Sequence, residues 1–503
     1  MRLDLNWRQA ARCAPAAAVL LVSACRAPAG GAPAPASDVR ALRASLDSML
    51  REPKYANASL GILVVDPARG DTLLSHNAGK LFMPASNQKL LTGAVALSQL
   101  GPDFRYSTTV YADGPIVDGA LRGSLRVAGT GDPSISDAMA RDAMVPLRAM
   151  ADSLAARGIQ RITQGLRPGG DAFPDATWGF GWSWDDTDFP YSAGVDELYL
   201  NEGFLTVRVW GSAPGTAPRV RVAPNATFPR VRLDARSVPR GDSIPRARRL
   251  RVEHDSADAT LIVVSGEIAA GDSSTLELSH RDHPRTFLEA LATALRERGI
   301  AVEGPISTQR PAPQAGREPM GTALFSWVSP PLAEILPAFE KPSQNQIGEI
   351  LLKTLGRSKT GVGSADSGAR VVRDQLLAWG ARADGFVVRD GSGLSRYDVV
   401  SPETIIRVLD AMRTGPHYAL FHRSLPIAGV DGTVRNRMRG TAAAGNVHAK
   451  TGTLNMVRSL SGYVTTAGGR PLLFSLLANH FTVPTREIDA LHEAIATRLA
   501  ALR

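Results

Sequence analysis

The strongest constraint on the fold is a change in hydrophobic pattern and composition that divides the 503-residue chain into three parts. Residues 38–104 and 282–503 contain amphipathic patterns typical of helices, together with apolar runs typical of buried strands. Between them, residues 105–281 consist of short alternating segments separated by Gly, Pro and Asp, which is typical of β-structure. We therefore predict an α/β domain that is split in sequence and carries a β-rich insertion of two small domains.

The outer parts predict the elements of the split domain. The apolar run SLGILVV at 59–65 predicts a buried strand, and residues 86–100 predict a helix that ends at Gly101-Pro102. Two strands at 456–465 and 471–478 are expected before a last helix at 485–502. Further helices are expected at 286–298, 332–339, 345–355, 368–379 and 401–412.

The charge of the chain does not indicate a nucleic-acid partner. The formal net charge is +9, and a basic balance of this kind is one feature of nucleic-acid binders. The arginines are scattered, however, and no basic run alternates with aromatic residues. No internal run of apolar residues is long enough for a membrane-spanning helix, which excludes a polytopic membrane protein.

Residues 1–24 are predicted to be an export signal, because three arginines precede a short apolar stretch at 14–24. The sequence VSAC at 22–25 is similar to a bacterial lipobox, in which Cys25 would be acylated and anchor the protein to a membrane. Ordinary cleavage after Ala24 is the alternative. Residues 25–37 are rich in Ala, Pro and Gly and are predicted to form a tether.

Export would leave the mature chain without a catalytic or metal-binding cysteine. The other cysteine, Cys13, is lost with the signal, and Cys25 would carry the lipid. We accordingly expect no metal site built on cysteine.

The first of three short motifs places a serine and a lysine on one face of a helix. In SNQK at 86–89, Ser86 and Lys89 are three residues apart, at the beginning of the helix predicted for 86–100. A neutral lysine can remove the proton of a serine hydroxyl and so create a nucleophile. By itself, this spacing usually means a capped helix with a solvated lysine.

The other two motifs are SQN at 343–345, where a helix is predicted to begin, and KTGT at 450–453, which leads into a predicted strand. An ordinary helix N-cap is the alternative interpretation of Ser343. Two segments with the same spacing, SHN at 75–77 and KTG at 359–361, are interpreted as chance matches, because the second leads into a predicted loop.

The order Ser-x-x-Lys, Ser-x-Asn, Lys-Thr-Gly resembles that of penicillin-binding proteins and serine β-lactamases. The first two motifs are 257 residues apart, from Ser86 to Ser343. Such a long gap, filled by a β-rich insertion, resembles the class C low-molecular-mass penicillin-binding proteins, the D-alanyl-D-alanine carboxypeptidase/endopeptidase family. Three further segments resemble this family: GDPS at 131–134, GWSWDD at 181–186 and DGSGLSR at 390–396.

The resemblance implies an α/β fold, a split penicillin-binding, serine β-lactamase-like transpeptidase domain with an antiparallel sheet and flanking helices. It also implies that Ser86 attacks the bond between two D-alanines of peptidoglycan stem peptides and forms an acyl-enzyme, with Lys89 accepting the proton. Ser343 would relay a proton to the leaving amine, and Asn345 would hold Lys89 and a substrate amide. The strand that begins with Lys450 would pair with the substrate backbone.

Substrate-binding residues are implied in the same way. Thr451 would contact the substrate carboxylate, Gly452 would belong to the same substrate-binding site, and the backbone N–H groups of Ser86 and Thr453 would form the oxyanion hole. The resemblance implies three residues that grip the diaminopimelate side chain in an endopeptidase reaction: Asp186, Tyr191 and Arg396. For Asp186, an ordinary turn residue is the alternative, and Asn455 replaces a glutamine that the family can carry after the third motif.

The expected partners are peptidoglycan stem peptides, β-lactam antibiotics as covalent inhibitors, and a membrane through the lipid anchor. No metal or organic cofactor is required. A β-lactamase would share the motifs but release penicillin products quickly, and the long insertion argues against it. A non-catalytic wall-binding protein would not need to retain the motif residues, which argues against that class.

Overall fold

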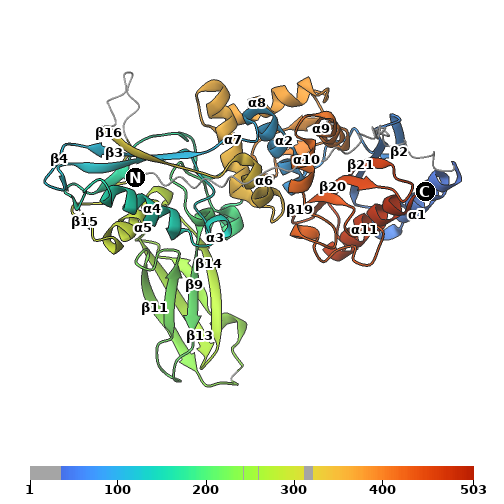
Figure 1. Ribbon diagram of the computed structural model, residues 1–503. Coiled ribbons are helices and arrows are strands. Elements are labelled where there is room, and N and C mark those ends of the chain that lie inside the picture. Colours follow the sequence, from blue (N-terminus) through green and yellow to red (C-terminus); the bar gives the residue numbers. More distant parts are fainter. Residues whose placement is uncertain (1–35, 242, 259, 311–320) are drawn as a thin grey trace, which may run out of the picture.

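The computed structural model describes residues 36–241, 243–258, 260–310 and 321–503 (Figure 1). The predicted signal at 1–24 and the predicted lipid attachment at Cys25 lie outside these residues. Across the described ranges, no helix combines the length and apolarity that crossing a membrane requires.

A five-stranded antiparallel sheet joins the two ends of the chain. Its order is β19-β20-β21-β1-β2, and β1 pairs with β21 through Leu60 opposite Ala478. The strands that precede the insertion therefore share one sheet with the strands that close the chain. Their bounds are β1 Ser59–Asp66, β2 Asp71–His76, β19 His448–Leu454, β20 Val457–Thr465 and β21 Pro471–Asn479.

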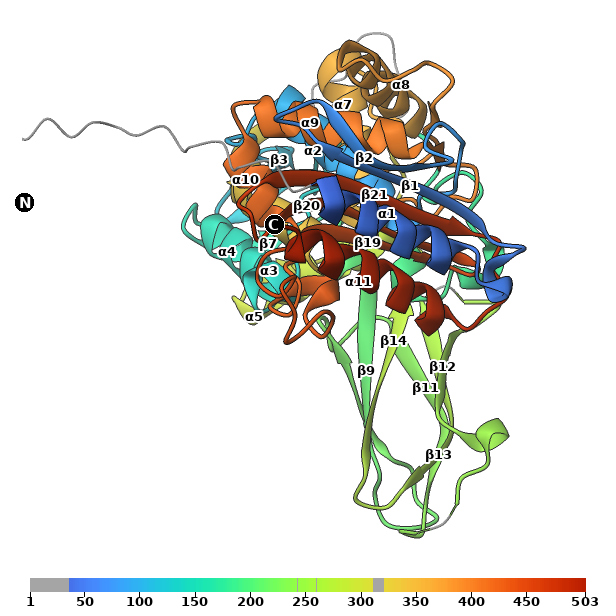
Figure 2. The ribbon, with the colours of Figure 1, turned by 90° about the vertical axis from the view of Figure 1, so that its right-hand side faces the viewer.

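Both faces of this sheet are covered by helices. Helices α1 (Ala36–Leu50) and α11 (Thr485–Ala501) lie across one face, as Figure 2 shows. In β1, Ile62 and Val64 point into the core beneath these helices, whereas Leu63 points into the core on the opposite face. A strand that is buried on both faces is apolar throughout, which is why the run at 59–65 predicted a buried strand.

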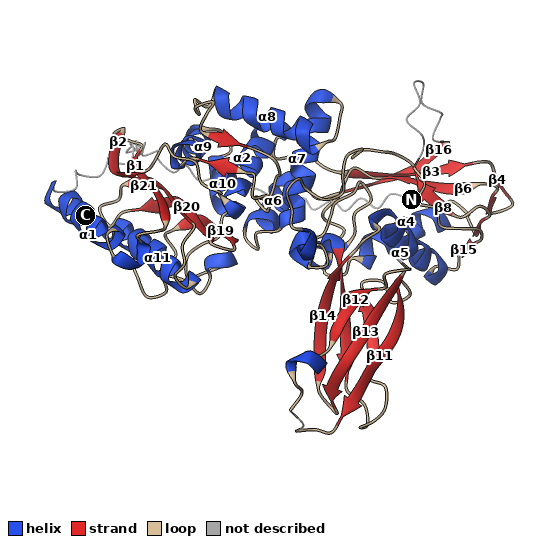
Figure 3. Cartoon of the chain, turned by 180° about the vertical axis from the view of Figure 1, so that it is seen from behind, coloured by secondary structure: helices blue, strands red, loops and turns tan. Residues whose placement is uncertain are grey.

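The opposite face is covered by a bundle of helices around α2 (Gln88–Leu100), whose first turn is the 3₁₀ helix η2 (Ala85–Asn87). Figure 3 shows these helices beside the sheet. The predicted α/β class with an antiparallel sheet and flanking helices is confirmed. The other helices of the bundle are α6 Leu332–Glu340, α7 Asn345–Thr360, α8 Ala365–Ala378, α9 Pro402–Thr414 and α10 Tyr418–Ser424.

The inserted part begins as a mixed α/β unit. A four-stranded sheet of order β16-β3-β6-β8 packs on α4 (Met144–Ala155) and α5 (His283–Glu297). A second small sheet, β15-β7-β5-β4, and helix α3 (Asp137–Ala140) complete this unit. The strands are β3 Ser107–Asp113, β4 Ile116–Val117, β5 Ala120–Leu121, β6 Ser124–Ala128, β7 Arg161–Ile162, β8 Leu166–Pro168, β15 Ala301–Val302 and β16 Thr322–Val328.

A second, all-β unit is nested inside the first and projects away from the rest of the molecule (Figure 1). It consists of two three-stranded sheets, β10-β9-β14 and β11-β13-β12, which enclose an apolar core of their own. The strands are β9 Phe204–Trp210, β10 Arg219–Ala223, β11 Arg230–Val238, β12 Arg251–His254, β13 Leu261–Ala269 and β14 Ser273–Ser279.

The boundary at 281/282 differs in the structure from the one that the sequence predicted. Helix α5 packs on α4, and β16 pairs with β3, so the chain returns to the first domain only after β16. The amphipathic pattern of α5 predicts a helix but carries no information about which core that helix joins. The pairing of β16 with β3 links segments more than 200 residues apart, and local patterns do not reveal such pairing.

Candidate active site

Ser86 lies half-buried in the 3₁₀ turn η2, at the beginning of α2. The residue before it, Ala85, has φ of 47°, a conformation that residues other than glycine rarely adopt. The loop at 390–398 holds this turn in place, because Gly393 is packed so closely that a Cβ atom there would lie 1.8 Å from the Ala85 carbonyl oxygen. Strain of this kind is typical of functional sites.

Lys89 is fully buried, and its Nζ has three polar neighbours. It lies 2.8 Å from Ser86 Oγ, 2.6 Å from Asn345 Oδ1 and 2.8 Å from the carbonyl oxygen of Ser392. Burial, together with the positive charge of Lys450, holds the pKa of Lys89 well below its usual value, although Asp390 opposes the shift. The serine and lysine of the first motif are therefore in direct contact.

The second motif lies in the turn between α6 and α7. The N-cap interpretation of Ser343 is wrong, because Gln344 is the N-cap and its side chain accepts a hydrogen bond from the Ile347 N–H. Ser343 itself has φ of 65°. Asn345 is the first residue of α7, and its Nδ2 donates to the Tyr191 carbonyl at 2.6 Å. Asn345 thus connects Lys89 to the inserted part of the chain.

Lys450 lies on β19 and is fully buried. Its Nζ donates to the Thr451 carbonyl at 3.2 Å, and its own carbonyl accepts from Asn87 Nδ2 at 2.8 Å. Burial lowers the pKa of Lys450 to about 8, and the nearby Glu340 carboxylate opposes this shift. The hydrogen bond from Asn87 holds the strand against the turn that carries Ser86.

Gly452 permits the closest approach between β19 and η2. A Cβ atom at this position would lie 2.1 Å from Ser459 Oγ and 2.9 Å from the Ser86 backbone nitrogen. Thr453, the next residue, is exposed. Thr451 donates from its hydroxyl to the Thr433 hydroxyl at 2.7 Å. The backbone of this strand therefore lies directly beside Ser86.

The loop at 390–398 is built around buried carboxylates that the sequence did not reveal as part of the site. Glu349 accepts hydrogen bonds from the backbone N–H groups of Gly391 and Ser392, and Asp390 accepts from that of Ser395. These bonds hold the peptide whose carbonyl faces Lys89. The sequence marks the segment DGSGLSR only through its family resemblance. The carbonyl that faces Lys89 belongs to the backbone and therefore leaves no side-chain pattern, and Glu349 lies on α7, about 40 residues before the loop.

Asp186 and Tyr191 form a pair at the rim, with the Tyr191 hydroxyl donating to Asp186 Oδ1 at 2.7 Å. Burial and the Asp186 carboxylate raise the pKa of Tyr191. Trp182 donates from its indole to Asp390 Oδ2 at 2.9 Å and so fixes this segment to the 390–398 loop. Arg396 is exposed on the same loop, and its guanidinium lies 3.5 Å from the Asn455 carbonyl oxygen.

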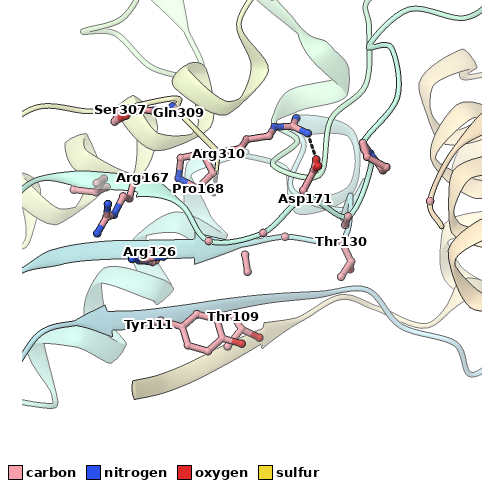
Figure 4. A pocket seen from close by; sticks show the side chains of 18 of the residues that line it. Thr109, Tyr111, Arg126, Thr130, Arg167, Pro168, Asp171, Ser307, Gln309 and Arg310 are labelled. Atoms are coloured by element: carbon pink, nitrogen blue, oxygen red, sulfur yellow. Dashed lines mark hydrogen bonds and ion pairs between the residues drawn. The ribbon is translucent and has the colours of Figure 1, made fainter. Parts of the chain in front are cut away.

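A cavity of about 980 Å³ lies elsewhere, on the sheet of the inserted α/β unit. Figure 4 shows Thr109, Tyr111 and Arg126 along it, and the ion pair between Arg310 and Asp171. None of the residues predicted for the site lines this cavity. No three His, Cys, Asp or Glu residues among those the structure describes form a group suited to a metal ion.

Comparison with known proteins shows the family of the chain. The family model for D-Ala-D-Ala carboxypeptidase 3 (S13) matches residues 42–502. A D-alanyl-D-alanine carboxypeptidase from Actinomadura sp. (strain R39) is 34% identical over 479 residues, covering 91% of this chain and 84% of the relative. The D-alanyl-D-alanine carboxypeptidase DacB from Haemophilus influenzae is 27% identical, over 84% of this chain and 86% of the relative.

Solved structures agree on the fold. Penicillin binding protein 4 (dacB) from Haemophilus influenzae superposes with a TM-score of 0.76 at 24% identity, covering 91% of this chain and 99% of that one. A second structure of that protein, complexed with a novel β-lactam, gives a TM-score of 0.71. The resemblance found in the order of the three motifs is confirmed, and the chain belongs to the D-Ala-D-Ala carboxypeptidase 3 (S13) family.

Proposed function

We propose that this chain, a serine D-Ala-D-Ala carboxypeptidase by family, cleaves peptidoglycan stem peptides with Ser86 as the nucleophile. The observation that carries the proposal is the set of three contacts at Lys89 Nζ. A neutral amine has two hydrogens and one lone pair. The Asn345 and Ser392 oxygens can only accept and take both hydrogens, which leaves the lone pair directed at the Ser86 hydroxyl.

In the acylation step, Ser86 Oγ attacks the carbonyl carbon between the two D-alanines while its proton passes to Lys89. We assign the stabilisation of the negative charge on the carbonyl oxygen to the backbone N–H groups of Ser86 and Thr453; the close approach of Gly452, the residue before Thr453, to the Ser86 backbone nitrogen supports this assignment. The C–N bond then breaks, and the terminal D-alanine leaves as an amine.

The leaving amine needs a proton, and the second motif supplies the route. We assign Ser343 to relay it, since Ser343 lies two residues before Asn345, whose amide contacts Lys89. Lys450, in its ammonium form, favours the substrate carboxylate, which Thr451 contacts. Water then hydrolyses the acyl-enzyme and restores Ser86. These steps use side chains, backbone N–H groups and water.

The rim pair supports an endopeptidase activity on crosslinks that contain diaminopimelate. Asp186 would accept the ammonium of that side chain, Tyr191 orients Asp186, and Arg396 would bind its carboxylate. Asn345 links this rim to Lys89 through the Tyr191 carbonyl, so a bound side chain would lie close to the reacting bond.

We also propose that the protein is exported to the cell envelope and held at a membrane by a lipid on Cys25, within the segment VSAC at 22–25. Replacing this residue, Cys25→Ser, should move the protein from the membrane fraction to the soluble fraction. A lipid-sized mass increase on the first mature peptide should disappear at the same time.

The decisive experiment is intact-protein and peptide mass spectrometry after brief exposure to penicillin, on wild type and on Ser86→Ala. A persistent adduct on the Ser86 peptide, missing in the variant, is the expected result. Rapid loss of penicillin without an adduct would instead indicate a β-lactamase. Intact penicillin with no adduct would indicate a non-catalytic wall-binding protein.

A further inference from the structure

Glu340, the last residue of α6, is a buried carboxylate that the proposed steps do not use. Its side chain is fully buried, and within the described part of the chain neither carboxylate oxygen has a hydrogen-bond partner. Burying an unpaired carboxylate is unfavourable, and buried polar groups in proteins nearly always have partners. Such a group therefore requires a physical reason for its position.

On one side, Glu340 packs against the helix that carries Lys89. A Cβ atom at Gly93 would lie 2.6 Å from Glu340 Oε1, so the glycine leaves the space that the carboxylate fills. Gly93 follows Lys89 by four residues on α2, and residues at this spacing share one helix face. The carboxylate thus lies on the face of α2 that presents Lys89.

On the other side, the end of α6 is connected to the strand that carries Lys450. The carbonyl of Lys341, the next residue, accepts from the Thr433 N–H at 3.1 Å. The Thr433 hydroxyl in turn accepts from the Thr451 hydroxyl at 2.7 Å. Glu340 is therefore held between the two elements that supply the active-site lysines.

Glu340, Lys450 and Lys89 are influenced by different sets of charged neighbours. Burial raises the pKa of Glu340 to about 7, opposed first by Lys450 and then by Lys89. Glu340 is the charged group that opposes the lowered pKa of Lys450, whereas Lys89 is influenced by Lys450, Asp390, Glu340 and Glu349 together. Neighbouring Lys341 is paired with Asp431.

We propose that Glu340 is a positioning residue that keeps the positive charge on Lys450 and so leaves Lys89 as the neutral base. The inference rests on the proposed function, in which one buried lysine must be neutral and the other cationic. Two ammonium groups this deeply buried repel each other, so only one is stable. A buried carboxylate without a hydrogen-bond partner in the described part of the chain, placed between α2 and β19, stabilises the ammonium that remains, which the proposed function requires to be that of Lys450.

The test is the pH profile of acylation by penicillin in Glu340→Gln, measured as a second-order rate constant from pH 5 to 10. Removing the carboxylate should lower the pKa of Lys450, so the alkaline limb should move to lower pH by about one unit, equivalent to a tenfold change in the protonation equilibrium. Glu334→Gln is the matched control, since Glu334 is exposed on the same helix. Its profile should superpose on that of wild type.

A second variant, Glu340→Leu, separates this role from a purely structural one. Its thermal midpoint should equal or exceed that of wild type, because it removes a buried carboxylate without partners, while its alkaline limb should move as in Glu340→Gln. An unmoved limb, or a uniform loss of rate at every pH, would overturn the inference alone. Failure of wild type to form the Ser86 adduct would overturn the proposed function and this inference with it.

Discussion

At the scale of single residues, the proposed chemistry depends on the protonation state of Lys89. Nearby carboxylates would favour its charged form, whereas burial favours its neutral form. Asp390 and Glu349 lie near Lys89, but their oxygens accept backbone N–H groups of the 390–398 loop. The direct partners of Lys89 Nζ are neutral oxygens of Asn345, Ser392 and Ser86. Neutral partners do not compensate for the cost of burying an ammonium, so burial is the largest influence on Lys89 and favours its neutral form.

Exchanging each active-site lysine for arginine tests this assignment. Arginine is always charged. Lys89→Arg should lower the acylation rate by about 10²–10⁴-fold, the usual contribution of a general base, with no recovery at alkaline pH. Lys450→Arg should retain far more activity, because the role proposed for Lys450 requires the positive charge. Stopped-flow acylation by penicillin measures both, and equal losses in the two variants would contradict the assignment.

The side chains of the site were more accessible to sequence reasoning than its backbone. Ser86, Lys89 and Asn345 belong to the motifs, and the structure brings Ser86 and Asn345 each within hydrogen-bond distance of Lys89. The Ser392 carbonyl could not be identified, because every residue has one. Glu340 could not be identified either, because the pattern LAEILPAFE does not reveal which polar residue of α6 is buried.

At the scale of elements, the site depends on the contact between β19 and η2. The Ser459 hydroxyl donates to the Pro84 carbonyl at 2.7 Å, and Asn87 donates to the Lys450 carbonyl. The first bond holds the neighbouring strand β20, which carries Ser459, and the second holds β19 itself against the Ser86 turn. The missing side chain of Gly452 lets the backbones of β19 and η2 meet. The proposed oxyanion hole requires this contact, because its two N–H groups come from different elements.

Gly452→Ala should therefore separate the two elements. The added methyl group would lie 2.7 Å from the Pro84 carbonyl oxygen, in addition to its overlap with Ser459 and Ser86. We expect acylation to fall by about 10²–10³-fold, the loss seen when one oxyanion-hole donor is removed. Gly79→Ala is the control, since the nearest atoms there are 3.6 Å away. Unchanged acylation in Gly452→Ala would refute the contact's role.

Helices and strands with clear periodicity were predictable, whereas their partners were not. Strand β1 and helix α11 lie within one residue of their predicted bounds, 59–65 and 485–502. Helix α4 was missed within the part predicted as mostly β, because it is a short element surrounded by short strands. Sheet membership depends on pairing between distant segments, as for β16 with β3, and this information is absent from local sequence.

At the scale of the whole molecule, the all-β unit is inserted at a single point. Its first and last strands are neighbours, with Phe204 paired with Ser279, and it has its own apolar core. Its base contacts the rim segment, because Ser279 donates from its N–H to the Asp188 carbonyl at 3.1 Å. The unit therefore touches the segment that carries Asp186 and Tyr191, while Ser86 and Lys89 depend on other elements.

Excision of residues 205–278, with a two-residue turn joining Phe204 to Ser279, should affect the rim segment but not the catalytic centre around Ser86. The antiparallel pairing leaves the two ends close enough for such a turn. We expect penicillin acylation to stay within about threefold of wild type, because the oxyanion hole and base need no part of the unit. Cleavage of diaminopimelate-containing crosslinks should fall about tenfold or more, because Ser279, whose N–H binds the Asp188 carbonyl, would no longer be held in place by the rest of β14. Parallel rate measurements on penicillin and on a purified crosslinked peptide distinguish the two effects, and equal losses on both substrates would show that the unit supports the catalytic centre itself.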